Sequence, residues 1–155
     1  MTLTRFLAIA LVALTPGVLN AASQMQDPAF GYWLTANGKA IVHVAPCGGT
    51  TCGKMVWVAN GYDQSGAQKL DLQNKDSAQR TRPICGLDLI GGLAKDAPGD
   101  WTDGWIYNPR DGSTYSVAVE SISTDELKVR GYLGIKVLGS SQVWTRVSGD
   151  RGGCV

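Results

Sequence analysis

Arg130 and Tyr132 are the residues whose types and spacing most clearly indicate chemistry in this sequence. They stand two positions apart in a strand-like stretch, so they share one face of that strand. A guanidinium and a phenol on one face can hold a ligand carboxylate through charge-assisted hydrogen bonds. The opposite face carries Leu127, Val129 and Leu133, and the apolar face of a half-buried strand normally points inward. The pair is therefore either an anion-binding site or part of the surface.

Asp71, Asn74 and Asp76 place three oxygen-bearing side chains in one polar stretch, residues 62–83. Oxygen ligands of this kind suit calcium, but the glycine and the distal glutamate of a calcium-binding loop are missing. Short acidic and amide residues more often form turns by hydrogen bonding to nearby backbone. The turn interpretation is favoured over calcium.

Arg80 and Arg82 belong to the same polar stretch. They would either receive an anionic ligand or partner at a barrel mouth, or pair with the nearby aspartates. Exposed pairs of that kind contribute only about 0–1 kcal/mol. A stretch of this length between elements is usually functional or disordered, so a lid role stays open.

Motifs for catalysis are not evident in the sequence. There is no nucleophile elbow, no His/Glu zinc motif and no phosphate-binding glycine loop. The only histidine, His43, lies in a strand-like stretch beside Ile41. Hydrolase-type chemistry would need two of Asp71, Asp76 and Glu120 to meet in a cleft with a perturbed pKa. We expect a protein that is not an enzyme, with no cofactor and no metal.

Five tryptophans are many for a chain of this size. Trp33 and Trp144 are most simply core residues. Trp57, Trp101 and Trp105 are either core or the apolar lining of a ligand site. Their spacing leaves both interpretations open.

The elements that position these residues have the pattern of strands. Short stretches with period-two alternation recur between Gly, Pro, Asn and Asp, and no stretch after residue 24 shows helical periodicity. Eight strands are predicted, at residues 31–35, 40–45, 54–59, 84–93, 101–108, 114–122, 126–133 and 141–147. One short helical turn is expected at residues 76–79. The prediction is an all-β fold, a single antiparallel meander barrel, with a sandwich as the alternative.

The four cysteines are an even number, which favours disulfides in an oxidising compartment. Cys47 and Cys52 flank a four-residue turn, so a hairpin would place them face to face across its neck. Cys85 then pairs with Cys154. A zinc site is the competing interpretation, but the expected Cys-x-x-Cys pairs are missing.

Residues 1–23 have the pattern of a cleavable signal peptide, with Arg5, an apolar run at 6–14 and small residues at 21–23. The apolar run is shorter than the roughly 20 residues of a membrane-spanning helix. We therefore expect an exported protein, periplasmic or extracellular, with one domain at residues 24–155 and no transmembrane segment in its mature form. An envelope protein is a possible partner.

The charge balance is close to neutral. The formal net charge is +1, and it falls to 0 without Arg5. No basic cluster could follow a phosphate backbone, which excludes nucleic acid as a partner. No polybasic or amphipathic stretch for a membrane surface is present either.

Two segments at opposite ends of the strand pattern belong together. Gly31-Tyr32-Trp33 begins the first expected strand, and Trp144-Thr145-Arg146 closes the last. The chain resembles lipocalin-like (calycin) barrels, which carry a Gly-x-Trp on the first strand and an Arg on the last. The resemblance implies that Arg146 packs over Trp33 and closes the barrel through a cation–π contact of about 0.5–2 kcal/mol.

The sequence as a whole is similar to a narrower family of exported bacterial proteins, the domain of unknown function number twenty-one forty-seven. The similarity spans nearly all of residues 31–146. It rests, in order, on Gly31–Thr35, Cys47-Gly48, Cys52-Gly53, Met55–Trp57, Asp71–Asn74, Arg80–Pro83, Gly86-Leu87, Trp101, Gly104–Pro109, Thr114-Tyr115, Leu127–Gly134 and Gln142–Arg146. The family often has Asn-Pro before its acidic residue, whereas Lys75 follows Asn74 here. The resemblance implies no particular activity, because the family has no settled function.

Two functions are expected from these patterns. The first is a non-enzymatic binding module of the cell envelope, holding a small lipophilic or anionic molecule in the barrel interior or mouth. Its candidate ligand-binding residues are Arg130, Tyr132, Trp57, Trp105, Arg80 and Arg82. The alternative is a structural or interaction protein with a solid core that acts through its surface or residues 62–83. Eight strands leave little interior room, so an interior filled by side chains would argue against the first.

Overall fold

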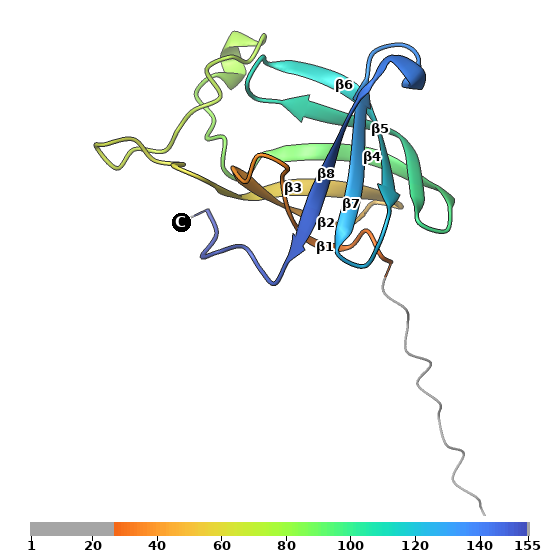
Figure 1. Cartoon of the computed structure of the whole chain (residues 1–155). Coiled ribbons are helices and arrows are strands. Elements are labelled where there is room, and N and C mark those ends of the chain that lie inside the picture. The colour runs from red at the N-terminus through yellow and green to blue at the C-terminus, as the bar shows by residue number, and fades with distance from the viewer. Residues whose placement is uncertain (1–26, 155) are drawn as a thin grey trace, which may run out of the picture.

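The computed structural model describes residues 27–154, which form a closed antiparallel barrel (Figure 1). The strands are β1 (Gly31–Leu34), β2 (Ala40–Cys47), β3 (Thr50–Val58), β4 (Asp88–Ala97), β5 (Asp100–Asn108), β6 (Ser113–Ser121), β7 (Glu126–Tyr132) and β8 (Ser140–Val147). Each strand pairs with the next along the chain, and β8 pairs with β1. The predicted eight-stranded meander barrel is therefore confirmed, and closure removes the exposed edges of the sheet.

Two short 3-10 helices interrupt the connections. η1 (Ser77–Gln79) is the helical turn expected in the long polar stretch, and the Asp76 side chain accepts a hydrogen bond from the Ala78 amide at its start. η2 (Lys136–Leu138) lies between β7 and β8 and was not predicted. No helix of residues 27–154 is long and apolar enough to cross a membrane. The expected signal peptide, residues 1–23, lies outside the described residues.

The interior of the barrel is filled by side chains from all parts of the sheet. Strand alternation turns one face of each strand inward, and register neighbours such as Leu127 and Trp144, or Trp101 and Val119, meet there. The tryptophans Trp33, Trp101 and Trp144 are each at most 2% exposed. Burying one such ring removes about 150–250 Å² from water, which contributes about 4–6 kcal/mol at 25 cal/mol per Å². The interior is a packed core.

Arg146 closes one end of the barrel. Its guanidinium carbon lies 4.1 Å from the centre of the Trp33 ring, and its N–H groups donate to the carbonyls of Phe30, Pro28 and Thr124. Gly31 has φ +133°, and a Cβ at this position would overlap the guanidinium. The Gly-x-Trp pattern thus has a physical reason, because the arginine occupies the space that a side chain would need.

Both predicted disulfides are present in the structure. Cys47 and Cys52 join across the β2–β3 turn with their Cα atoms 5.8 Å apart. Cys85 and Cys154 have a Cα separation of 5.6 Å and connect the C-terminal segment to the residues before β4. The returning segment also places Arg151 over the Trp57 ring at 5.0 Å.

The largest differences from the predicted strand boundaries, four residues each, are at the start of β3 and at both ends of β4, which ends at Ala97 rather than at residue 93. β3 begins at Thr50 rather than at residue 54, because the β2–β3 ladder runs up to the cystine. β4 begins at Asp88 rather than at residue 84, since the Ile84 amide donates to the Lys69 carbonyl and Gly86 turns the chain with φ +90°. Residues 84–87 therefore belong to the long connection before β4.

Candidate functional site

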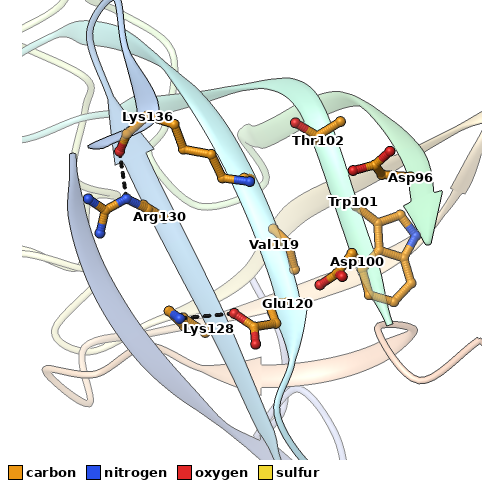
Figure 2. A pocket seen from close by; sticks show the side chains of 10 residues that line it. Asp96, Asp100, Trp101, Thr102, Val119, Glu120, Lys128, Arg130 and Lys136 are labelled. Atoms are coloured by element: carbon orange, nitrogen blue, oxygen red, sulfur yellow. Dashed lines mark hydrogen bonds and ion pairs between the residues drawn. The ribbon is translucent and has the colours of Figure 1, made fainter. Parts of the chain in front are cut away.

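A hollow of about 310 Å³ lies on the outer face of β5, β6 and β7 (Figure 2). The register shows that this face is outward, because Ala118 pairs with Arg130 and alternates with Val117 and Val119, which lie in the core. Ala118 is only 5% exposed. Its methyl group is too small to fill the space between the longer side chains around it, so it lies at the bottom of the hollow.

Charged side chains of both signs surround this floor. Lys128 on β7 and Glu120 on β6 form an ion pair with a Nζ–Oε2 distance of 2.9 Å. Arg130 is also engaged: its Nε donates to the Lys136 carbonyl at 2.7 Å, and its two terminal nitrogens donate to the Val137 carbonyl and the Ser141 hydroxyl. These groups therefore already have partners within the protein.

Three other charges at the hollow are not so engaged. Within residues 27–154, Asp96, Asp100 and Lys136 form no ion pair. The two carboxylates come from the β4–β5 hairpin, whereas Lys136 extends from η2 toward β6 on the other side (Figure 2). The hollow thus has an anionic side and a cationic side separated by a small neutral floor.

A second polar cluster lies where the long connection, residues 59–87, packs against β5. The Asp71 side chain is completely buried and accepts hydrogen bonds from the Tyr107 hydroxyl at 2.7 Å and from the Asn74 amide at 2.8 Å. Arg82 completes the cluster with an ion pair of 2.9 Å to Asp71 and lies 5.2 Å from the Tyr107 ring centre. All four side chains are directed at one another.

This cluster fixes the connection rather than opening it to a ligand. Burial raises the pKa of Tyr107 above its usual range, and the hydrogen bond that its hydroxyl donates to Asp71 raises it further. The protonated phenol is therefore the form that the cluster holds. The Asp71 amide also donates to the Arg82 carbonyl, and an isolated bridge joins Leu70 to Pro83. The oxygens considered as calcium ligands accept hydrogen bonds from the protein instead. Among the residues that the structure describes, no three His, Cys, Asp or Glu side chains gather to hold a metal ion.

We expect Asp71→Asn to lower the free energy of unfolding by about 2 kcal/mol. Breaking a fully buried ion pair costs about 3–5 kcal/mol, and the value is smaller here because the Arg82 side chain is 36% exposed. Urea unfolding at neutral pH measures the loss. Asp88→Asn is the matched control, since Asp88 pairs with Lys54 at 3.5 Å while both side chains are mostly exposed. Equal losses in the two variants would contradict a structural role for the cluster.

The residues singled out from the sequence do not form one site. Arg130 and Tyr132 share the outer face of β7, where Arg130 holds η2 and Tyr132 pairs with Ser116. Trp57 lies under Arg151, and Trp105 is 41% exposed and covers Gly91. Arg80 donates from its Nε to the Asn74 carbonyl at 2.7 Å, and Arg82 pairs with Asp71. Of the six ligand candidates, only Arg130 lines the hollow.

The residues that give the hollow its character were not singled out by sequence reasoning. Asp96 and Asp100 lie in one hairpin, and Lys136 follows more than thirty positions later in an apolar stretch. The only signal available was the alternation of β6, which turns the small Ala118 outward between the polar Ser116 and Glu120. That pattern indicates a depression but not the charges around it.

A closed eight-stranded meander, with the tryptophan of its first strand covered by the arginine of its last, defines a lipocalin-like barrel. A solved structure with this fold is described as "Protein HP1028 from the human pathogen Helicobacter pylori belongs to the lipocalin family". It matches with a TM-score of 0.65 and 24% identity, over 78% of this chain and 84% of that one, which shows the fold. No curated protein matches the chain. The chain belongs to the family described as "Uncharacterized protein conserved in bacteria (DUF2147)", whose model matches residues 31–146.

Proposed function

We propose that this protein is an exported, non-enzymatic binding module of the bacterial cell envelope, and that its ligand site is the hollow on the outside of β5–β7. Two disulfides support export, because such bonds persist in oxidising compartments. The lipocalin-like fold is compatible with a binding role. The packed interior argues against the interior site expected from the sequence, so the proposal moves binding to the outer surface.

The arrangement of charges around the hollow carries the proposal. Lys136 stands on one side, and Asp96 and Asp100 stand on the other, without ion-pair partners in the part of the chain that the structure describes. A small molecule with an anionic and a cationic group would satisfy both sides at once. The volume of about 310 Å³ is at the lower end of the range for ligand pockets. We therefore assign a small zwitterion, of the size of an amino acid or a short peptide, as the ligand class.

The carboxylates considered for hydrolysis have separate surroundings, which supports a non-enzymatic role. Asp71 lies in the buried cluster, Asp76 caps η1, and Glu120 pairs with Lys128. These contacts do not bring any two of the three carboxylates together in one cleft. General acid–base catalysis by a carboxylate pair needs such a cleft with a perturbed pKa.

Titration of the mature protein with single amino acids and dipeptides at millimolar concentration tests the proposal. We expect backbone NMR shifts confined to the β4–β5 hairpin, β6, β7 and η2, and Lys136→Gln should weaken binding about tenfold, since one charge-assisted hydrogen bond contributes about 1.5 kcal/mol. Lys39→Gln, in the β1–β2 turn, is the matched control and should bind as the parent does. Shifts elsewhere, or equal affinity in both variants, would contradict this site.

A further inference from the structure

The connection between β7 and β8 exposes four large aliphatic side chains in six residues. Leu133, Ile135, Val137 and Leu138 are 69%, 62%, 81% and 78% exposed, respectively. We call these four side chains the apolar tip; the connection that carries them joins β7 to β8 in Figure 1. Single exposed apolar residues are ordinary on protein surfaces, but contiguous ones indicate an interaction site.

The apolar tip is held in place by hydrogen bonds. Arg130 reaches up from β7 and donates to the carbonyls of Lys136 and Val137, and it also contacts the Ser141 hydroxyl of β8. Gly139 packs so closely that a Cβ there would lie 2.5 Å from the Gly131 carbonyl oxygen. The exposure of the four side chains is therefore a property of a defined backbone conformation.

The meander topology places the apolar tip at one end of the barrel, together with the connections 35–39, 59–87 and 109–112. We call this the loop end. Other exposed large apolar side chains also belong to these connections, namely Tyr62, Leu70 and Leu72. The connections at the opposite end, 48–49, 98–99 and 122–125, expose only Ile122 among the described side chains of this kind. Apolar exposure is thus concentrated at the loop end.

Positively charged residues are also concentrated at the loop end. The four connections of the loop end contain seven Lys or Arg and four Asp, whereas the three at the opposite end contain one Asp and no Lys or Arg. From Arg130 to Trp144 the charged residues are Arg130 and Lys136, both positive. The sequence has no polybasic stretch, but the topology brings separate basic residues to the same end of the barrel as the apolar tip.

We propose that the apolar tip docks the protein onto an anionic lipid bilayer. Exposed aliphatic side chains with no hydrogen-bonding groups suit the boundary between headgroups and acyl chains, and each nearby cation adds attraction to anionic lipid. The exposed apolar tip, with only the positive side chains Arg130 and Lys136 beside it in the sequence, suits an anionic bilayer surface better than a groove on a protein partner. This inference goes beyond the proposed ligand site and does not depend on it.

Sedimentation with large unilamellar vesicles tests the docking. We expect the mature protein to bind vesicles of mixed phosphatidylglycerol and phosphatidylcholine, to bind phosphatidylcholine alone less, and to lose affinity as salt is raised. Val137→Asp should reduce the partition coefficient about tenfold or more. It removes one aliphatic group that docking buries in the bilayer, and it adds a negative charge that the anionic lipid repels. Lys136→Gln should reduce binding about fivefold on anionic vesicles only.

Ile122→Asp is the matched control, since it places the same charge on an exposed aliphatic position at the opposite end. It should bind vesicles as the parent does, and all variants should keep the parental melting temperature. Leu138→Asp provides a second variant of the apolar tip. The proposal is overturned if the parent does not bind anionic vesicles, or if Val137→Asp and Leu138→Asp bind as the parent does. It is equally overturned if the parent forms a dimer in lipid-free buffer that Val137→Asp abolishes, because the apolar tip is then a self-interface.

Discussion

Replacing Cys85 and Cys154 together by serine is expected to lower the free energy of unfolding by about 4 kcal/mol. The bond joins residues 69 positions apart, so its removal releases a long loop in the unfolded chain. In the folded state the same bond holds the C-terminal segment against β3, where the Cys154 sulfur lies 3.6 Å from the Met55 carbonyl oxygen. The loss is large compared with the free energy of unfolding of a typical domain, which is roughly 5–15 kcal/mol. Urea unfolding of the mature protein, followed by tryptophan fluorescence, measures it.

The pair Cys47→Ser and Cys52→Ser is the internal control for this result. That bond spans only 5 positions, and it joins strands already paired in the β2–β3 ladder. The chain-entropy model gives about 2 kcal/mol for it. Losses of equal size in the two double variants would show that loop length does not set the contribution of these bonds. No loss on removing the longer bond would show that the C-terminal segment adds nothing to stability.

The barrel could be predicted from the sequence because its determinants are local. Period-two alternation within single strands and Asn-Gly or Asp-Gly turns between them define a meander without knowledge of distant contacts. The closing contact between Trp33 and Arg146 was accessible because both residues lie at fixed places in a pattern shared with lipocalin-like barrels. Where alternation fails, so did the prediction. In β3 the alternation is interrupted at Gly53, whose missing side chain leaves room for Val42 and Ile90. The first four residues of this strand, from Thr50 on, were therefore not predicted.

The surroundings of Asp71 could not be predicted, because they depend on long-range contacts. A carboxylate flanked by Leu70 and Leu72 in a polar stretch resembles a turn residue. Its burial depends on Tyr107, which is 36 positions away and belongs to a strand end. The hollow is a similar case, since its two sides come from the β4–β5 hairpin and from η2. Strand alternation predicts which way each side chain points, but not which distant charges lie together.

Gly112→Ala is the second substitution with a large expected effect, and it tests how tightly residues 59–87 are fixed to the barrel. Gly112 lies in the β5–β6 turn with φ +67°, and a Cβ there would penetrate the carbonyl oxygen of Gln73 and lie 3.0 Å from the Asn74 Cα. Asn74 belongs to the buried cluster with Asp71 and Tyr107. An alanine would therefore push the connection away from the turn and separate these hydrogen-bonding partners. We expect a loss of about 2–5 kcal/mol, the sum of about 1–2 kcal/mol for the left-handed backbone and about 1–3 kcal/mol for the overlap.

Gly66→Ala separates these two contributions. Gly66 has φ +83°, similar to Gly112, but a Cβ there would meet nothing within 4 Å. Its replacement should cost only the backbone contribution of about 1–2 kcal/mol, so the difference between the variants measures the contact with Gln73. Hydrogen exchange of the Asp71 and Asn74 amides, which donate within the connection, should accelerate in Gly112→Ala and stay unchanged in Gly66→Ala. If both variants lose the same stability and keep the same exchange rates, the connection moves independently of the turn, and a lid role for residues 62–83 becomes the better interpretation.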